Sequence, residues 1–180
     1  MGSDLHLPEG APSAVAVVLH PHPSMGGDRH HPLVVAVAEG LAAAGVAALR
    51  PDLTDPDPER SATALVSLAV DLAEDQGVDR TLVVGYSWGS AVTSLAEPPG
   101  LAARVLVAPP VAMLELGGHD GTPALVLVPE HDQYGGPDAA RAALGDRAGT
   151  EIEVVPGADH FLVGAVARIA DRAVAWLTAG

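Results

Sequence analysis

Short runs of apolar residues alternate along the chain with longer segments in which apolar and polar residues are mixed. The short runs are rich in valine, leucine and alanine, which is typical of strands buried on both faces of a parallel sheet. The longer segments stop at glycine or shortly before proline, as helices do. The sequence therefore predicts main strands at 14–19, 46–49, 81–84, 104–108, 124–128 and 151–155, and helices at 31–44, 59–76, 90–96, 138–144 and 163–177.

This alternation predicts an α/β fold with right-handed crossovers and a compact, doubly wound, mostly parallel six-stranded sheet. Leu5 and Leu7, in the lead-in formed by residues 1–13, are consistent with a little additional edge strand. No internal repeat or low-complexity linker is present, so residues 1–180 are expected to form a single domain. No connection is long enough for a cap or lid domain, which predicts an open or shallow site.

Composition and charge narrow the class of function. Residues are 48% apolar but only 3% aromatic, so the core must be built from alanine, valine and leucine. The net charge of −14 and the absence of any basic cluster make nucleic acid and membrane surfaces poor partners. Cysteine is absent, which excludes disulfides and thiol nucleophiles. The sequence shows neither a signal-peptide pattern nor an apolar run of membrane-spanning length, so we expect a cytoplasmic protein.

The stretch Gly85-Tyr86-Ser87-Trp88-Gly89 stands between a predicted strand and a predicted helix. In Gly-x-Ser-x-Gly, small residues flank the serine because larger side chains would strike the strand and helix backbones in a sharp turn. The serine hydroxyl is then held above the end of the sheet, beside the positive N-terminus of the helix. We interpret the stretch as a nucleophile elbow with Ser87 at its apex. The alternative is that Ser87 only caps the helix.

A serine hydroxyl is a poor nucleophile unless a base removes its proton and an acceptor orients that base. We predict that His160 is the base of Ser87, because it follows a strand and has Pro-Gly before it. His131 and His119 are the alternatives. Asp159, next to His160, is expected to brace its loop rather than to join the chemistry.

Asp132 is the predicted acceptor for the second nitrogen of His160. Glu130 and Asp138 compete with it, but Glu130 lies closer to the strand and Asp138 is expected to cap its helix. Polar residues that follow parallel strands meet at the carboxyl edge of the sheet, where ligands bind. The chain order Ser87, Asp132, His160 is also the order expected for this fold class.

An oxyanion formed during acyl transfer needs backbone N–H donors. Trp88, directly after the nucleophile, offers one. The second is expected from His-Pro-His-Pro at positions 20–23, where His22 is the only free donor because proline has no N–H. Ser24 and Met25 are the fallbacks. The side chains of His20 and His22 are expected to tie down loop backbone rather than to act chemically.

Four motifs together resemble the small, lidless α/β-hydrolases related to dienelactone hydrolases and bacterial serine esterases. They are His-Pro-His-Pro-x-x-Gly-Gly, Gly-x-Ser-x-Gly, Glu-His-Asp-Gln-Tyr and Gly-Ala-Asp-His-Phe, within a likeness that spans residues 14 to 178. The resemblance implies a triad, an oxyanion hole and no cofactor; the residues would be Ser87, Asp132 and His160 for the triad and His22 and Trp88 for the hole. This chain departs from true dienelactone hydrolases in carrying serine rather than cysteine, and from many members in Pro51-Asp52-Leu53-Thr54.

The predicted function is that of a serine hydrolase that cleaves esters or thioesters of small acids through an acyl-enzyme intermediate on Ser87. Its partner is a small-molecule acyl substrate, and the chain is expected to be a monomer or a homodimer. Six side chains are candidates for lining an acyl pocket, with ordinary packing as the alternative for each: Met25, Met113, Leu114, Leu116, Tyr134 and Phe161.

Two other functions compete with hydrolysis. A lyase, isomerase or acyltransferase in a biosynthetic pathway could use the same His160 and oxyanion hole. Metal binding or a pure binding role is the third, because His20/His22 and His30/His31 are close in sequence. Proline separates the first pair, however, and no His-Glu-x-x-His spacing is present. No metal is therefore expected.

Overall fold

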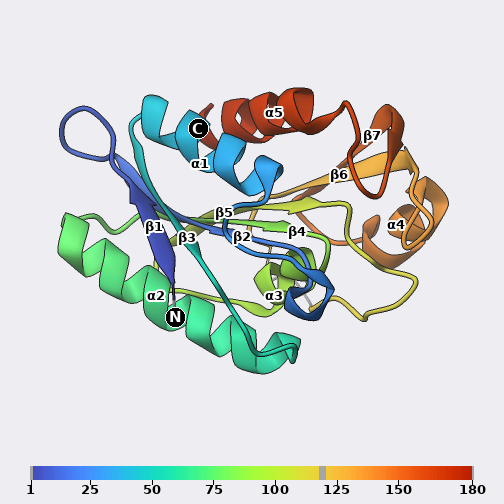
Figure 1. Cartoon of the computed structure of the whole chain (residues 1–180), viewed down its shortest axis with the longest axis horizontal. Helices are drawn as coiled ribbons and strands as arrows, with labels where there is room; N and C mark the ends of the chain where they lie inside the picture. Colours follow the sequence, from blue (N-terminus) through green and yellow to red (C-terminus); the bar gives the residue numbers. More distant parts are fainter. Residues whose placement is uncertain (1, 118–120, 180) are drawn as a thin grey trace.

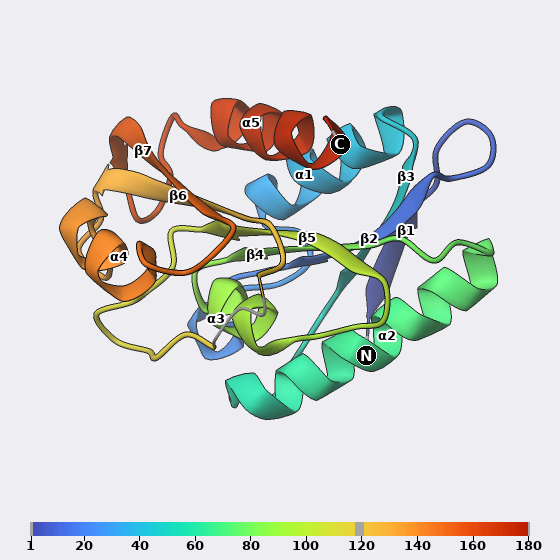
Figure 2. The same cartoon turned by 180° about the vertical axis from the view of Figure 1, so that it is seen from behind.

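The computed structural model describes residues 2–117 and 121–179. In this part of the chain, one sheet of seven strands carries helices on both faces (Figures 1 and 2). The strands are β1 (Ser3–His6), β2 (Ala14–Leu19), β3 (Val46–Pro51), β4 (Thr81–Tyr86), β5 (Leu101–Val107), β6 (Ala124–His131) and β7 (Thr150–Asp159). The helices are α1 (Pro32–Ala43), α2 (Pro58–Gln76), α3 (Trp88–Leu95), α4 (Pro137–Leu144) and α5 (Val166–Thr178), with a 3-10 turn η1 (Pro23–Met25).

The strand order is β1-β3-β2-β4-β5-β6-β7, and every pair is parallel except β1 with β3. The α/β fold with a mostly parallel sheet is confirmed, and the six predicted strands are the parallel ones. The predicted count of six is corrected by β1, which pairs antiparallel to β3. Polar contacts hold this exposed strand: Asp4 accepts a hydrogen bond from Arg29 and lies 3.4 Å from Arg50. Apolar periodicity therefore signals β1 only weakly.

The two halves of the sheet diverge at β2. Strand β3 lies on one side of β2 and β4 on the other, so the chain reverses its direction of winding there. In open α/β sheets, such a switch point leaves a crevice at the carboxyl ends of the strands. The segments that leave β2 and β4 at this point are the loop 20–27 and the Gly85–Gly89 stretch.

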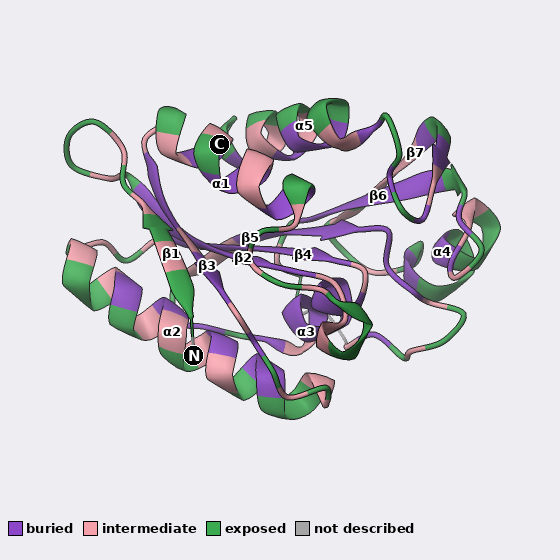
Figure 3. Ribbon diagram, in the orientation of Figure 1, coloured by how far each residue is buried: buried purple, intermediate pink, exposed green. Residues whose placement is uncertain are grey.

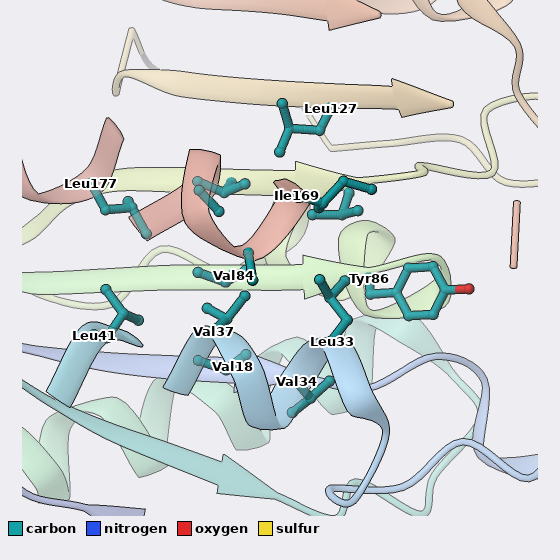
Figure 4. Close-up of a cluster of buried hydrophobic side chains, with 14 of the residues drawn as sticks. Val18, Leu33, Val34, Val37, Leu41, Val84, Tyr86, Leu127, Ile169 and Leu177 are labelled. Atoms are coloured by element: carbon teal, nitrogen blue, oxygen red, sulfur yellow. The ribbon is translucent and has the colours of Figure 1, made fainter. Parts of the chain in front are cut away.

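Alternating strand residues supply two cores. Helices α1 and α5 cover one face of the sheet, and α2, α3 and α4 cover the other (Figures 1 and 3). Val18 of β2 and Val84 of β4 pack under Leu33 of α1 on the first face (Figure 4). Their neighbours Val17 and Val83 pack on the second face. In the described part of the chain, no helix is both long enough and apolar enough to cross a membrane.

Strands β6 and β7 run further than the sequence indicates. The predicted loops that begin after 128 and 155 are still paired, with Pro129 opposite Val155 and His131 opposite Asp159. A shift of register between these two pairs absorbs the local irregularity. Pro156 is tolerated because β7 is an edge strand, and Pro129 lies beyond Leu127, the last residue of β6 that pairs with β5.

Candidate active site

Ser87 occupies a sharp turn between β4 and α3. Its backbone lies at φ 54° and ψ −118°, in a region that non-glycine residues rarely adopt. A Cβ on Gly85 would lie 2.1 Å from the Gly89 carbonyl oxygen, and one on Gly89 would lie 2.7 Å from the His20 carbonyl oxygen. Both glycines are therefore required by close backbone approach. Ser87 makes no side-chain cap bond to α3, so the capping alternative is wrong.

The Ser87 side chain faces a histidine and, behind it, a carboxylate. Ser87 Oγ lies 2.9 Å from His160 Nε2. His160 Nδ1 lies 2.8 Å from Asp132 Oδ2 and 3.0 Å from Oδ1. Because an ionised carboxylate only accepts, Nδ1 carries the proton and Nε2 is left to accept from the serine hydroxyl. The imidazole and carboxylate are both buried.

The extension of β6 and β7 explains why Asp132 and His160 meet. His131 and Asp159 are directly opposed in the ladder, so the next residue of each strand leaves the sheet at the same place. Tyr134 N–H donates to Asp132 Oδ1 at 2.8 Å, which fixes the carboxylate within its loop.

The alternatives for acid and base do not reach Ser87. Glu130 is exposed and accepts from Gly157 N–H, and His131 is exposed beside it, 3.9 Å away. Asp138 was expected to cap a helix, which is wrong: Gly136 occupies that position in α4, and Asp138 pairs with Arg141. His119 lies outside the described residues.

Two residues brace His160 from its own loop and from β4. Asp159 accepts a hydrogen bond from Phe161 N–H, as expected of a loop brace. The Tyr86 hydroxyl donates to the carbonyl oxygen of His160 at 2.8 Å, in a buried setting. Burial, with the charges of Asp132 and Asp159, raises the pKa of Tyr86 far above its ordinary value, so this donor stays protonated. Sequence reasoning missed Tyr86, because nothing in a strand tyrosine next to Ser87 indicates a hydrogen bond to a residue 74 positions away.

Two backbone N–H groups at the cavity have no hydrogen-bond acceptor among the described residues. Trp88 begins α3, so its N–H has no acceptor within the helix. The N–H of His22 also donates no hydrogen bond within residues 2–117 and 121–179. Both residues line the same cavity as Ser87.

The His20 and His22 side chains hold loop backbone, as expected. His20 Nε2 accepts from Leu53 N–H at 3.0 Å, and its Nδ1 lies 2.6 Å from the Pro21 carbonyl oxygen. His22 Nδ1 accepts from Ser24 N–H at 3.2 Å. Trp88 Nε1 donates to the Pro56 carbonyl oxygen, so the segment 51–58 is tied to the site through two hydrogen bonds.

A cavity of about 470 Å³ opens beside Ser87 and His160. Five of the six predicted pocket residues line it, together with His31, which sequence reasoning missed; the five are Met25, Met113, Leu114, Tyr134 and Phe161. Leu116 does not line it and is buried in the core between α3 and α4, so that expectation is wrong. The described lining contains no arginine, lysine, aspartate or glutamate.

No group of three His, Cys, Asp or Glu side chains among the described residues is placed to hold a metal ion. His30, the exposed partner of His31 in sequence, lies 4.0 Å from Asp4. His20 and His22 make the backbone contacts given above. The histidine pairs thus have other partners in the structure.

Solved structures with the same architecture are α/β-hydrolases. A serine hydrolase homologue from Coxiella burnetii shares 21% identity at a TM-score of 0.83, over 97% of this chain and 90% of that one. A lidless serine hydrolase from Xanthomonas campestris shares 20% identity at 0.79, over 97% and 86%. Dienelactone hydrolase from Anabaena variabilis shares 23% identity at 0.76, over 97% and 89%. No family model matches the sequence, and no curated protein matches it significantly.

At these identities the likeness establishes the fold and not the reaction. The chain therefore has the lidless α/β-hydrolase fold that its motifs predicted. Any inference of catalytic roles rests on the geometry around Ser87.

Proposed function

We propose that this protein is a serine hydrolase that cleaves esters or thioesters of small acids through an acyl-enzyme on Ser87. One observation carries the proposal: the hydrogen-bonded series Ser87, His160, Asp132 stands at a strained turn in the wall of a cavity. The packing of the fold does not by itself require a buried histidine between a serine and a carboxylate. The arrangement supplies the nucleophile, the base and the group that orients the base.

In the proposed reaction, Ser87 Oγ attacks the acyl carbon as His160 Nε2 takes its proton. Asp132 keeps the imidazole in the tautomer with hydrogen on Nδ1 and stabilises the imidazolium that forms. The N–H groups of His22 and Trp88 bind the oxyanion, beside the positive N-terminus of α3. His160 then protonates the leaving alcohol or thiol. A water molecule, activated by the same histidine, releases the acid and restores Ser87.

The lining of the cavity favours small, uncharged acyl groups. Met25, Met113 and Leu114 offer apolar surface, and Tyr134 and Phe161 add aromatic rings that also pack against His160. A volume of about 470 Å³ is in the lower half of the range for ligand pockets, which is about 300–1,000 Å³. With no cation in the described lining, an anionic acyl group would lose its hydration without gaining a partner.

The proposal is tested first with a fluorophosphonate and intact-mass spectrometry. The native protein should gain one adduct, and Ser87→Ala none. Ser24→Ala is the matched control, because Ser24 is exposed and only its backbone N–H is used; it should react like the native protein. Hydrolysis of p-nitrophenyl butyrate should fall at least about 10⁴-fold in Ser87→Ala.

Failure to label the native protein would overturn the proposal, because an activated serine in an open cavity should react. Labelling without acid release from any ester would instead favour a lyase, isomerase or acyltransferase at the same site. Acid release is therefore followed by titration alongside the chromophore.

A further inference from the structure

His31 is one of the polar residues, with His22, Ser87 and His160, in the lining of a largely apolar cavity. It is the residue before α1, it is half-buried, and it lines the cavity with Ser87. Its ring packs on Tyr86, with the two centroids 4.8 Å apart and the planes tilted by 39°. This packing places the ring beside the candidate catalytic residues, although His31 contacts neither Ser87 nor His160 by a hydrogen bond in the described structure.

The backbone of α1 determines which nitrogen of His31 carries hydrogen. Nδ1 accepts the N–H of Leu33 at 3.3 Å, as a helix cap does. A nitrogen that accepts from an N–H is unprotonated, so the hydrogen of the neutral ring is on Nε2. Within the described residues, Nε2 has no hydrogen-bond partner. Burial lowers the pKa of His31, and the charge of Asp28 opposes this shift. The lowered pKa keeps the ring neutral near pH 7.

A helix cap does not by itself call for histidine. Serine, threonine, aspartate and asparagine fill that role most often, and each uses one acceptor atom on a short side chain. Histidine adds a second, opposite nitrogen that reaches away from the helix. Because His31 lines the cavity, its unpartnered Nε2–H is a candidate donor to a bound molecule, and the described lining carries no arginine, lysine or carboxylate.

We propose that His31 is a substrate-binding residue that donates a hydrogen bond from Nε2 to an uncharged oxygen of the substrate. The oxygen belongs to a hydroxyl, ether or carbonyl group outside the bond that is cleaved. The inference rests on the proposed hydrolysis and narrows its substrates to small neutral esters or thioesters with a second oxygen acceptor. A purely alkyl acyl chain leaves the His31 N–H without a partner, which disfavours binding.

The test compares pairs of p-nitrophenyl esters that differ in one atom. Methoxyacetyl and butyryl esters form one pair, and 3-methoxypropionyl and pentanoyl esters form another, with ether oxygen replacing methylene at successive positions. For each pair, the ratio of kcat/KM (oxygen over methylene) is measured for the native protein and its variants. Intrinsic reactivity differs within a pair but cancels when the ratios of two proteins are compared.

Two variants remove the donor at the position of Nε2 in different ways; the amide N–H of the shorter asparagine side chain does not extend to that position. His31→Asn keeps an acceptor for Leu33 N–H, and His31→Phe keeps a ring against Tyr86. His30→Asn is the matched control, because His30 is exposed and outside the cavity lining. Thermal unfolding of each variant shows whether it is folded at the assay temperature.

For at least one pair, the native ratio should exceed that of both His31 variants by roughly fivefold, the value of one neutral hydrogen bond. The His30→Asn ratio should equal the native one. Equal ratios in the native protein and in folded His31 variants would overturn the role of His31 while leaving hydrolysis intact. Absence of hydrolysis of every ester by the native protein would instead overturn the proposed function.

Discussion

Tyr86 links two parts of the candidate site that lie 74 positions apart in the sequence. Its backbone leads directly into Ser87, and its hydroxyl donates to the carbonyl of His160. A shift of β4 relative to the His160 loop would therefore stretch this hydrogen bond and the contact between Ser87 and His160 together. We infer that Tyr86 is a positioning residue for the base, although it does not touch the reacting atoms.

Tyr86→Phe should lower kcat about three- to tenfold with little change in KM, because substrate contacts remain while the base is less well aligned. The free energy of unfolding should fall by about 1 kcal/mol, since a buried carbonyl loses its donor. Steady-state kinetics and urea unfolding measure the two effects.

Tyr134→Phe is the control for this prediction. Tyr134 packs edge-on against the His160 ring, but its hydroxyl donates no hydrogen bond within the described residues. Its loss should leave kcat near the native value. An equal loss in both variants, or a rise in KM alone for Tyr86→Phe, would contradict the positioning role.

The sequence predicted the polar residues of the site better than their supports. Ser87, Asp132 and His160 could be found because each follows a strand, and parallel strands deliver such residues to one edge. Tyr86 and His31 could not be found in this way. A tyrosine in a buried strand and a histidine before a helix look the same whether or not a distant partner or a cavity faces them.

Strand ends decide how the elements meet at the site. Prolines at 129 and 156 indicated that two strands stop, yet both strands continue and pair up to His131 and Asp159. The causes are tertiary features of which local sequence carries no sign: Pro156 lies on the edge strand β7, and Pro129 lies beyond the last pairing of β6 with β5. β1 was equally indistinct because ion pairs rather than apolar runs hold it. The parallel strands were predictable because each is a nearly continuous buried run.

Gly89→Ala should disturb the junction of three elements. The added Cβ would lie 2.7 Å from the His20 carbonyl oxygen and 2.9 Å from that of Leu19, so α3 and the end of β2 must separate. We expect a loss of about 1–3 kcal/mol in the free energy of unfolding. The loss of kcat/KM should be larger than the loss of folded protein explains, since the loop that contains His22 follows the end of β2 directly. Denaturant unfolding and ester kinetics test both.

Gly136→Ala serves as its control. Gly136 has φ −58°, and an added Cβ would lie 3.2 Å from its nearest neighbour, so a small adjustment accommodates alanine. Its stability should change by less than about 0.5 kcal/mol. Comparable losses in the two variants would show that the close approach at Gly89 is not the cause.

The start of α1 should make stability depend on pH. Burial lowers the pKa of His31 below its ordinary 6.5, with Asp28 opposing and His20 reinforcing the shift. Below pH 6.5 the unfolded chain therefore binds a proton more readily than the folded one, and stability falls as the pH decreases. Protonation at Nδ1 would also break the cap bond to Leu33. The free energy of unfolding, measured with urea between pH 7.5 and about 5, should decline more steeply for the native protein than for His31→Asn. Parallel curves for the two proteins would contradict a lowered pKa of His31.

Charge acts on the site at the scale of the whole molecule. The chain carries a net charge of −14, from 23 acidic and 9 basic residues. Because the described cavity lining bears no charged lysine, arginine or carboxylate, the field there comes from more distant residues. Distant charges are screened by salt, whereas contacts within a cavity are screened much less. Salt dependence thus separates the two causes of substrate selection.

Esters with anionic, neutral and cationic acyl chains of similar length should respond differently to salt. At low ionic strength the negative protein repels a carboxylate-bearing ester and attracts one bearing a quaternary ammonium group. Raising the salt concentration from about 0.01 M to about 1 M shortens the screening length from about 30 Å to about 3 Å. We therefore expect kcat/KM to rise several-fold for the anionic ester and to fall for the cationic one, with the neutral ester as the unchanged reference. If kcat/KM for the anionic ester stayed low at all salt concentrations, the net charge would not be the cause. The ester would then be excluded by the cavity, whose described lining offers no cationic side chain to its carboxylate.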